Sequence, residues 1–180
     1  MLIHREQSLL LIVDIQEKLA PAILQADEVI ANTVKLIHAA KQLNVPILAS
    51  EQYPKGLGRT VPALRELLPT ETLFDKTHFS CLGEPGVADR LRQQQRQQII
   101  ICGMEAHVCV LQTAMDIKVA GFTTIVVADA VSSRRAESYE VGLARMRDAG
   151  VTIVTTEMVL FEWIGQAGTP EFKALLPLIK

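Results

Sequence analysis

Short runs of apolar residues alternate with longer amphipathic stretches along this chain. Continuous apolar runs, as opposed to alternating ones, are typical of strands that are buried on both faces of a parallel sheet. We therefore predict six buried strands, at Leu9–Val13, Val45–Ala49, Thr72–Phe74, Ile99–Ile101, Thr124–Val127 and Val151–Val154.

The stretches between these runs have helical spacing. In the first of them Ile30, Val34 and Ile37 fall on one face, as in an amphipathic helix that packs on a sheet. Gly121 and Gly150 each stand just before a predicted strand, where glycine commonly ends a helix. Strands that alternate with helices predict an α/β fold, because right-handed crossovers place helices on both faces of a parallel sheet. We expect a Rossmann-like three-layer α/β/α sandwich with a six-stranded parallel sheet, in a single domain over residues 1–180.

Composition and charge narrow the class of protein. Hydrophobic residues make up 49% of the 180 residues and charged residues 21%, as in a globular protein. The formal net charge is -2 and the 18 Lys and Arg residues are scattered, so we expect no nucleic-acid partner. No apolar run has the length of a membrane span, and the N-terminus lacks the features of a signal peptide, so we expect no membrane partner.

The cysteines indicate a cellular compartment. Cys81, Cys102 and Cys109 have neither C-x-x-C nor zinc-ligand spacing. An odd number of cysteines without such spacing favours free thiols in a reducing environment. We therefore expect a cytoplasmic protein.

Three chemically distinct side chains follow predicted strands. Asp14 follows the first strand, Lys76 follows the third, and Cys109 comes shortly after the fourth, where a helix is expected to begin. The carboxyl ends of parallel strands meet at one edge of the sheet, where ligands bind in open α/β folds. An acid, a cation and a thiol at this edge have the composition of a nucleophilic site. Taken singly, each also fits a plainer role as a turn-forming acid, a surface lysine or a small buried hydrophobe.

Cys109 differs from the other two cysteines in its place along the chain. Cys102 lies inside a predicted strand and is expected to be buried, and Cys81 lies in a predicted loop with no assigned role. Cys109 is expected in the first turn of a helix, where the helix dipole and free N–H groups favour a thiolate. Cys109 is therefore the candidate nucleophile.

Four segments together resemble the signature of a known family. They are Val13–Gln16, Lys76–Ser80, Gly103–Val110 and Val127–Ser133. In this order they are similar to the isochorismatase-like (cysteine hydrolase) superfamily, and the similarity extends from about residue 8 to residue 156. The pattern is nearest to the isochorismatase-domain proteins whose substrate is unassigned.

The resemblance implies a catalytic triad of Asp14, Lys76 and Cys109. Lys76 is expected to lower the pKa of Cys109 enough to hold a thiolate at neutral pH, with the helix N-terminus as a secondary influence. Asp14 is expected to act as the general base and to return the proton to a leaving amine. The implied reaction is hydrolysis of a C–N bond, of an amide or a ureide, in a small molecule through a thioester.

The resemblance also implies features of the loop before the nucleophile. A cis peptide bond is expected between Met104 and Glu105, and the main-chain N–H groups of Val108 and Cys109 are expected to form an oxyanion hole.

Candidate substrate contacts come from the ends of the first three strands. They are Gln16, Tyr53 and Phe79, of which the two aromatic residues fit a packing role equally well. Pro54, Gly56, Gly58 and Pro62 make residues 51–69 a loop with a short helix, which either closes over the pocket or forms a rigid turn.

Departures from two subgroups of the superfamily refine the expectation. Nicotinamidases carry a metal site with an Asp-x-His segment, whereas Ser50–Gly58 contains no histidine and the four histidines of the chain do not cluster. We therefore expect no metal and no cofactor. Isochorismatases of the phenazine type lack the cysteine, so the presence of Cys109 argues against vinyl-ether hydrolysis, which stays an alternative.

Two further alternatives belong to other classes. A nucleotide- or flavin-binding protein is disfavoured because no glycine-rich phosphate loop follows the first strand. A non-catalytic α/β binding module is disfavoured because the triad residue types are intact. We also expect a homo-oligomer, since Phe161–Ile164 and Phe172–Ile179 offer apolar surface for a partner.

Overall fold

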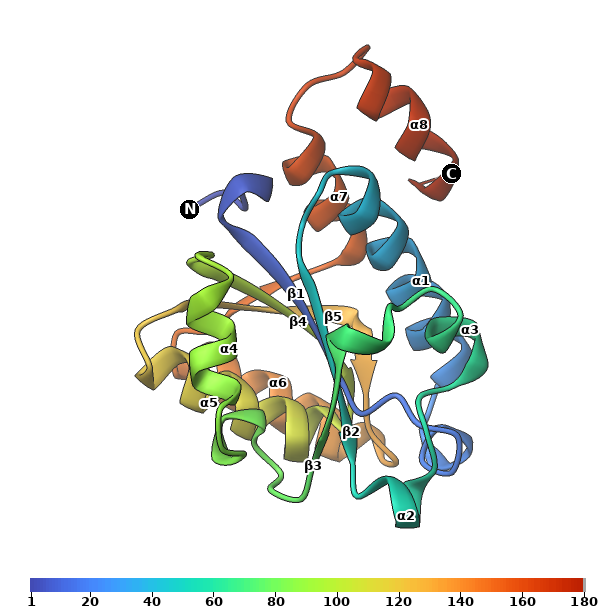
Figure 1. Ribbon diagram of the computed structural model, residues 1–180, viewed down its shortest axis with the longest axis vertical. Coiled ribbons are helices and arrows are strands. Elements are labelled where there is room, and N and C mark those ends of the chain that lie inside the picture. The colour runs from blue at the N-terminus through green and yellow to red at the C-terminus, as the bar shows by residue number, and fades with distance from the viewer. Residues whose placement is uncertain (180) are drawn as a thin grey trace.

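In a computed structural model that describes residues 1–179, one six-stranded parallel sheet runs through the centre of the molecule (Figure 1). The strand order is β3-β2-β1-β4-β5-β6, so the first strand lies in the middle and the chain winds outward in both directions. The predicted α/β fold with a six-stranded parallel sheet is confirmed. The strands are β1 Ser8–Val13, β2 Ile47–Gln52, β3 Leu73–Lys76, β4 Gln98–Met104, β5 Thr123–Ser132 and β6 Thr152–Val154.

Helices cover both faces of this sheet (Figure 1). The α-helices are α1 Ala26–Gln42, α2 Pro54–Leu57, α3 Pro62–Arg65, α4 Val87–Gln93, α5 Leu111–Val119, α6 Ala136–Asp148, α7 Thr156–Ile164 and α8 Pro170–Ile179. Short helical turns occur at η1 Arg5–Gln7, η2 Ala20–Ala22, η3 Thr70–Thr72, η4 Cys81–Gly83 and η5 Ala106–Val110.

Two hydrophobic cores explain why the strands are continuous apolar runs. In β1, Leu10 and Ile12 point into a core covered by α1, α7 and α8, whereas Leu9, Leu11 and Val13 point into a core covered by α4, α5 and α6. Successive side chains of a strand point to opposite faces, so a strand covered on both faces needs apolar residues at every position.

The two central strands approach most closely at Gly103 of β4. A Cβ atom at this position would lie 2.0 Å from the carbonyl oxygen of Val13, and Gly103 has a φ of 131°. Only glycine tolerates both conditions. This glycine therefore allows β1 and β4 to end side by side, next to the residues that follow them.

Several elements differ from the sequence-based expectation. β2 and β5 extend beyond their expected apolar runs into segments with polar residues, because main-chain pairing continues past those runs. Residues 51–69 carry two short helices instead of one. The C-terminal segments are not free apolar surface throughout: Trp163 and Leu175 are each 2% exposed within the chain's own core, while Phe161 is exposed.

None of the helices in the described residues combines the length and the apolar character needed to cross a membrane.

Candidate active site

An ion pair joins the ends of β1 and β3. The Nζ atom of Lys76 lies 2.8 Å from Oδ2 of Asp14, and both side chains are 0% exposed. Asp14 directly follows β1 and has a left-handed φ of 53°, so the chain turns as it leaves the sheet. A charge pair buried this completely needs further hydrogen bonds to offset its desolvation.

The ammonium of Lys76 has four acceptors. It donates to Asp14, to Oε1 of Gln52 at 2.5 Å, and to the carbonyl oxygens of His78 at 3.1 Å and Phe79 at 3.0 Å. An ammonium group has three protons, so every one of them is engaged. Lys76 therefore acts on its surroundings as a fixed charge without a free donor.

The carboxylate of Asp14 has a second partner in Ser50, whose Oγ donates to Oδ1 at 2.7 Å. Sequence reasoning missed both Ser50 and Gln52. Their signal was a change from apolar to polar residues at the end of β2, where Ser50 and Gln52 stand two positions apart with Glu51 between them. Residues at this spacing share one face of a strand, and here that face meets the ion pair.

Gln16 is committed to the main chain. Its Nε2 donates to the carbonyl oxygens of Gln52 at 3.0 Å and Gly58 at 2.7 Å, and its Oε1 accepts from the N–H of Gln52 at 2.8 Å. The side chain is fully buried, with both amide protons engaged. Gln16 therefore fixes the end of β2 and the following loop. The sequence had instead suggested Gln16 as a substrate contact.

The loop before α2 is also anchored. The buried carboxylate of Glu51 accepts from the N–H of Thr60 at 2.6 Å and from its hydroxyl at 2.7 Å, and forms an ion pair with Arg59 at 2.6 Å. Together with the bond from Gln16 to Gly58, these contacts make residues 51–60 a fixed turn on the sheet edge.

Cys109 lies in a helical turn of unusual width between β4 and α5. The N–H of Val110 donates to the carbonyl oxygen of Glu105, five residues earlier, at 3.2 Å. Such π-type turns are frequent at functional sites. The helix begins at Ala106, so Cys109 is in its first turn, and its thiol lies close enough to Asp14 and Lys76 for both charges to act on its pKa. The acid, the cation and the thiol of the predicted triad are thus brought together.

The turn is held from the end of β5. The peptide bond between Met104 and Glu105 is cis. The Glu105 carboxylate accepts from both the main-chain N–H and the Nε of Arg134, each at 3.0 Å, and Nδ1 of His107 lies 2.9 Å from the hydroxyl of Ser133. Arg134 and Ser133 were not identified from the sequence, because their partners lie more than 20 residues away.

The main-chain N–H of Val108 is already engaged. It donates to the carbonyl oxygen of Glu105 at 3.1 Å. An oxyanion hole that uses this group has to share or open that bond when substrate binds.

The protonation of Cys109 differs from the expectation. Burial raises the pKa of the Cys109 thiol above its ordinary value, and the Asp14 carboxylate raises it further, while Lys76 acts in the opposite direction. The direction of this shift is opposite to the one expected from the sequence. Asp14, which is paired directly with Lys76, outweighs the influence of the cation on the thiol.

The two other cysteines are buried free thiols. Burial raises the pKa of Cys102 to about 12. Burial, and then the Asp14 charge, raise the pKa of Cys81 to about 11, and the main-chain N–H of Cys81 donates to the Thr113 hydroxyl at 2.9 Å. Cys81 thus lies beside the ion pair, although the sequence placed it in a loop with no role.

The aromatic candidates for substrate contact are exposed. Tyr53 lines a cavity of about 450 Å³ next to β3, together with Arg59, Asp75 and Lys76. The Lys76 side chain is 0% exposed, so its main chain is the part that faces this cavity. Phe79 is 55% exposed, and its carbonyl oxygen holds the Lys76 ammonium.

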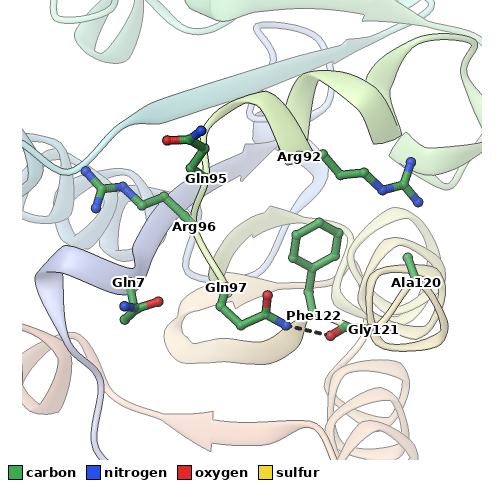
Figure 2. A pocket seen from close by; sticks show the side chains of 8 residues that line it. All are labelled: Gln7, Arg92, Gln95, Arg96, Gln97, Ala120, Gly121 and Phe122. Atoms are coloured by element: carbon green, nitrogen blue, oxygen red, sulfur yellow. Dashed lines mark hydrogen bonds between the residues drawn. The ribbon is translucent and has the colours of Figure 1, made fainter.

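Another cavity, of about 420 Å³, lies at the end of the sheet where the strands begin, away from the ion pair (Figure 2). Its walls come from the segments before β1, β4 and β5, and include Arg92, Arg96 and Gln97. The guanidinium groups of Arg92 and Arg96 point away from each other (Figure 2), so they do not converge on an anion. This cavity has no contact with Asp14, Lys76 or Cys109.

Among residues 1–179, no three His, Cys, Asp or Glu side chains group together as ligands for a metal ion.

Comparison with known proteins identifies similar chains. The family model described as Isochorismatase domain matches residues 8–158. "Isochorismatase domain-containing protein 2" of Danio rerio is 42% identical over 173 residues, which cover 96% of this chain and 86% of that protein. "Secreted isochorismatase effector Isc1" of Phytophthora sojae is 39% identical over 178 residues, which cover 96% of this chain and 84% of that protein.

A similar solved structure is described as MAR1 Ribonuclease from Caenorhabditis elegans. It is 41% identical in sequence, with a TM-score of 0.93, and the similarity covers 99% of this chain and 92% of that chain.

Proposed function

Because the chain belongs to the isochorismatase domain family of hydrolases, we propose that it cleaves a C–N bond, of an amide or a ureide, in a small molecule with Cys109 as the nucleophile. One observation carries this proposal. The Cys109 thiol lies close enough to the Asp14 carboxylate for that charge to act on its pKa, and Asp14 is itself paired with the buried Lys76 ammonium. A nucleophile, a base and a fixed positive charge close together are the parts that acyl transfer requires.

The first chemical step starts from the neutral thiol. As the sulfur of Cys109 attacks the carbonyl carbon, its proton moves to the carboxylate of Asp14, and the C=O electron pair moves to the oxygen. The Lys76 ammonium stabilises the negative charge that passes through the site, because it is fixed close by and shielded from water. Main-chain N–H groups of the turn, including that of Cys109, are proposed to hold the oxyanion.

The tetrahedral intermediate then collapses. The C–N bond breaks, Asp14 returns the proton to the leaving nitrogen, and a thioester on Cys109 is left. Water, deprotonated by Asp14, attacks the thioester, and the released sulfur takes the proton back. The enzyme ends in its starting state, and no metal or cofactor is part of this scheme.

The tethering of the turn supports the proposal. Glu105 holds Arg134 through two hydrogen bonds, so the segment that carries Cys109 is fixed to the end of β5. A nucleophile is efficient only when it is held within a fraction of an ångström of the productive geometry.

Ribonuclease activity, which the name of the Caenorhabditis elegans structure states for that protein, is less well supported here. Phosphate recognition needs free cationic donors. All three protons of the buried Lys76 are engaged, and the net charge of the chain is -2. We therefore propose a small-molecule substrate and no nucleic acid.

The proposal also covers the cellular compartment, the domain organisation and the oligomeric state. Three buried free cysteines support a reducing, cytoplasmic compartment, although the name of the Phytophthora sojae relative describes that protein as secreted. One continuous sheet supports a single domain over residues 1–180. The exposed Phe161 supports a homo-oligomer.

A substrate screen tests the proposed bond class. Small amides, ureides, carbamoyl compounds and vinyl ethers are incubated with the wild-type protein and with Cys109→Ala, and release of ammonia, amine or enol product is measured. We expect release of ammonia or amine that Cys109→Ala abolishes. Cleavage of a vinyl ether that survives in Cys109→Ala would overturn the proposal in favour of isochorismatase-type chemistry.

A further inference from the structure

The end of β2 lies between the two charges of the site. In the sheet, Ser50 lies beside Val13 of β1, and Gln52 lies beside Lys76 of β3. Side chains two positions apart share a face of the strand, so Ser50 and Gln52 both point toward the Asp14–Lys76 pair. Glu51, between them, points to the opposite face and binds Thr60.

Each of these two residues holds one member of the ion pair. Ser50 donates its hydroxyl proton to Oδ1 of Asp14 at 2.7 Å. Gln52 accepts from Nζ of Lys76 at 2.5 Å and donates through Nε2 to the carbonyl oxygen of Thr77 at 2.8 Å. Because Gln52 donates to a carbonyl oxygen, its amide is oriented with Oε1 toward the ammonium.

The end of β2 is also held by contacts outside the ion pair. Gln16 binds both the N–H and the carbonyl oxygen of Gln52, the Gln52 amide donates to the carbonyl oxygen of Thr77, and Ser50 is 1% exposed. The end of β2 is therefore a rigid platform on which the two charges are placed.

Both residues are uncharged, which sets the charge balance at the thiol. The titratable groups that act on the Cys109 thiol are Asp14 from the end of β1, Lys76 from β3 and Cys81 from η4. The inward residues of β2 add no charge, and the carboxylate of Glu105 faces Arg134. The thiol thus lies beside one balanced ion pair.

We propose that Ser50 and Gln52 are positioning residues that set the proton affinity of Cys109: Ser50 fixes the Asp14 carboxylate, and Gln52 fixes the Lys76 ammonium without adding a second negative charge. The role in turnover rests on the proposed function. The effect on proton affinity does not, because it follows from the contacts alone.

Two substitutions change this balance in a defined direction. Gln52→Glu places a second carboxylate against Lys76, so a thiolate at Cys109 becomes less favourable. Ser50→Ala removes a hydrogen bond from the charged form of Asp14 and makes the carboxylate a stronger base, so transfer of the thiol proton to Asp14 becomes more favourable. Ser50→Thr retains the hydroxyl and is expected to restore the wild-type behaviour.

The test is the rate of Cys109 alkylation by iodoacetamide as a function of pH, followed by peptide mass spectrometry. Gln52→Glu is expected to shift the titration upward, with alkylation roughly tenfold slower per unit of pKa at a fixed pH below the midpoint, and Ser50→Ala is expected to make alkylation below the midpoint faster. Gln97→Glu adds the same charge just before β4, in the cavity of Figure 2, and is expected to leave the titration of Cys109 unchanged.

Unchanged titrations in both Gln52→Glu and Ser50→Ala, in protein with a cooperative unfolding transition, would overturn the inference. Alkylation requires no substrate, so this outcome is distinct from a failure of the proposed function, which is the absence of hydrolysis in the wild-type protein. A shift that appears equally in Gln97→Glu would also contradict it, because the effect would then come from net charge.

Discussion

Lys76 and Asp14 form an ion pair at 2.8 Å in which neither side chain has any exposure to solvent. The pair links two strands that are not adjacent, because β2 lies between β1 and β3. The ion pair therefore forms only when β1, β2 and β3 are assembled side by side.

Lys76→Met is predicted to destabilise the protein as well as stop turnover. Removal of the cation leaves Asp14 buried without its counter-charge, which costs about 3–5 kcal/mol. Urea unfolding measures this loss. Adding Asp14→Asn to Lys76→Met removes the uncompensated charge and is expected to recover part of the stability but none of the activity. A single mutant as stable as the wild type would show that the pair is not buried in solution.

The three cysteines are predicted to differ in function. Cys109→Ala is expected to abolish hydrolysis while leaving the unfolding transition intact, because the thiol is not needed for the ion pair. The matched control is Cys102→Ala, which removes a buried thiol on the other side of the sheet. It is expected to lose less than about 2 kcal/mol of stability and to keep its activity. Loss of activity in Cys102→Ala at full stability would contradict this assignment.

Gly103→Ala is predicted to prevent folding or to cost more than about 4 kcal/mol. The added Cβ would lie 2.0 Å from the Val13 carbonyl oxygen, on a backbone that has no room to move. Gly121→Ala is the control, since Gly121 also has a positive φ, of 91°, but no atom within 4 Å of the new Cβ. It is expected to cost about 1–2 kcal/mol. Thermal unfolding of the two variants compares them directly, and equal losses would show that the close approach is absent.

Glu51→Gln is predicted to change how stability depends on pH. Burial alone raises the pKa of Glu51, but the hydrogen bonds from Arg59 and Thr60 outweigh it and hold the pKa below its ordinary value of 4.5. A lowered carboxyl pKa adds stability that is fully present above the unfolded value and is lost as pH falls through the folded value.

The free energy of unfolding, measured from pH 7 to pH 3, checks this prediction. The difference between wild type and Glu51→Gln is expected to be largest above about pH 5 and to shrink as the pH falls below 4.5. A difference that is constant over this range would indicate that Glu51 does not ionise differently in the folded state.

The fold and the grouping of Asp14, Lys76 and Cys109 were predictable because their signals are local. Continuous apolar runs such as Leu9–Val13 predict a strand covered on both faces, and both cores are present. The three chemical side chains each lie at or soon after the carboxyl end of a strand, so the parallel order of the sheet is enough to bring Asp14, Lys76 and Cys109 together.

The parts that were not predictable depend on partners far away in the sequence. Ser50 and Gln52 hold residues 36 and 24 positions away, respectively, so their polar character at the end of β2 is visible in the sequence but their partners are not. Gln16 looked like a substrate contact because it follows the strand, but its amide binds the main chain of Gln52 and Gly58.

The pKa of Cys109 shifts in the direction opposite to the expected one for a related reason. A helix N-terminus and a lysine are visible in the sequence, and both favour a thiolate. Burial of the thiol and its closeness to the Asp14 charge are consequences of tertiary packing, and they raise the pKa instead.

The most direct test of Cys109 as the nucleophile is the mass of the enzyme during turnover. A substrate found in the screen is mixed with wild-type protein, the reaction is stopped with acid within the first turnovers, and the peptides are analysed by mass spectrometry. We predict a mass increase equal to the acyl part of the substrate on the peptide that contains Cys109, and no increase on the peptides of Cys81 or Cys102. Turnover without an acyl group on Cys109, together with undiminished hydrolysis in Cys109→Ala, would contradict the account.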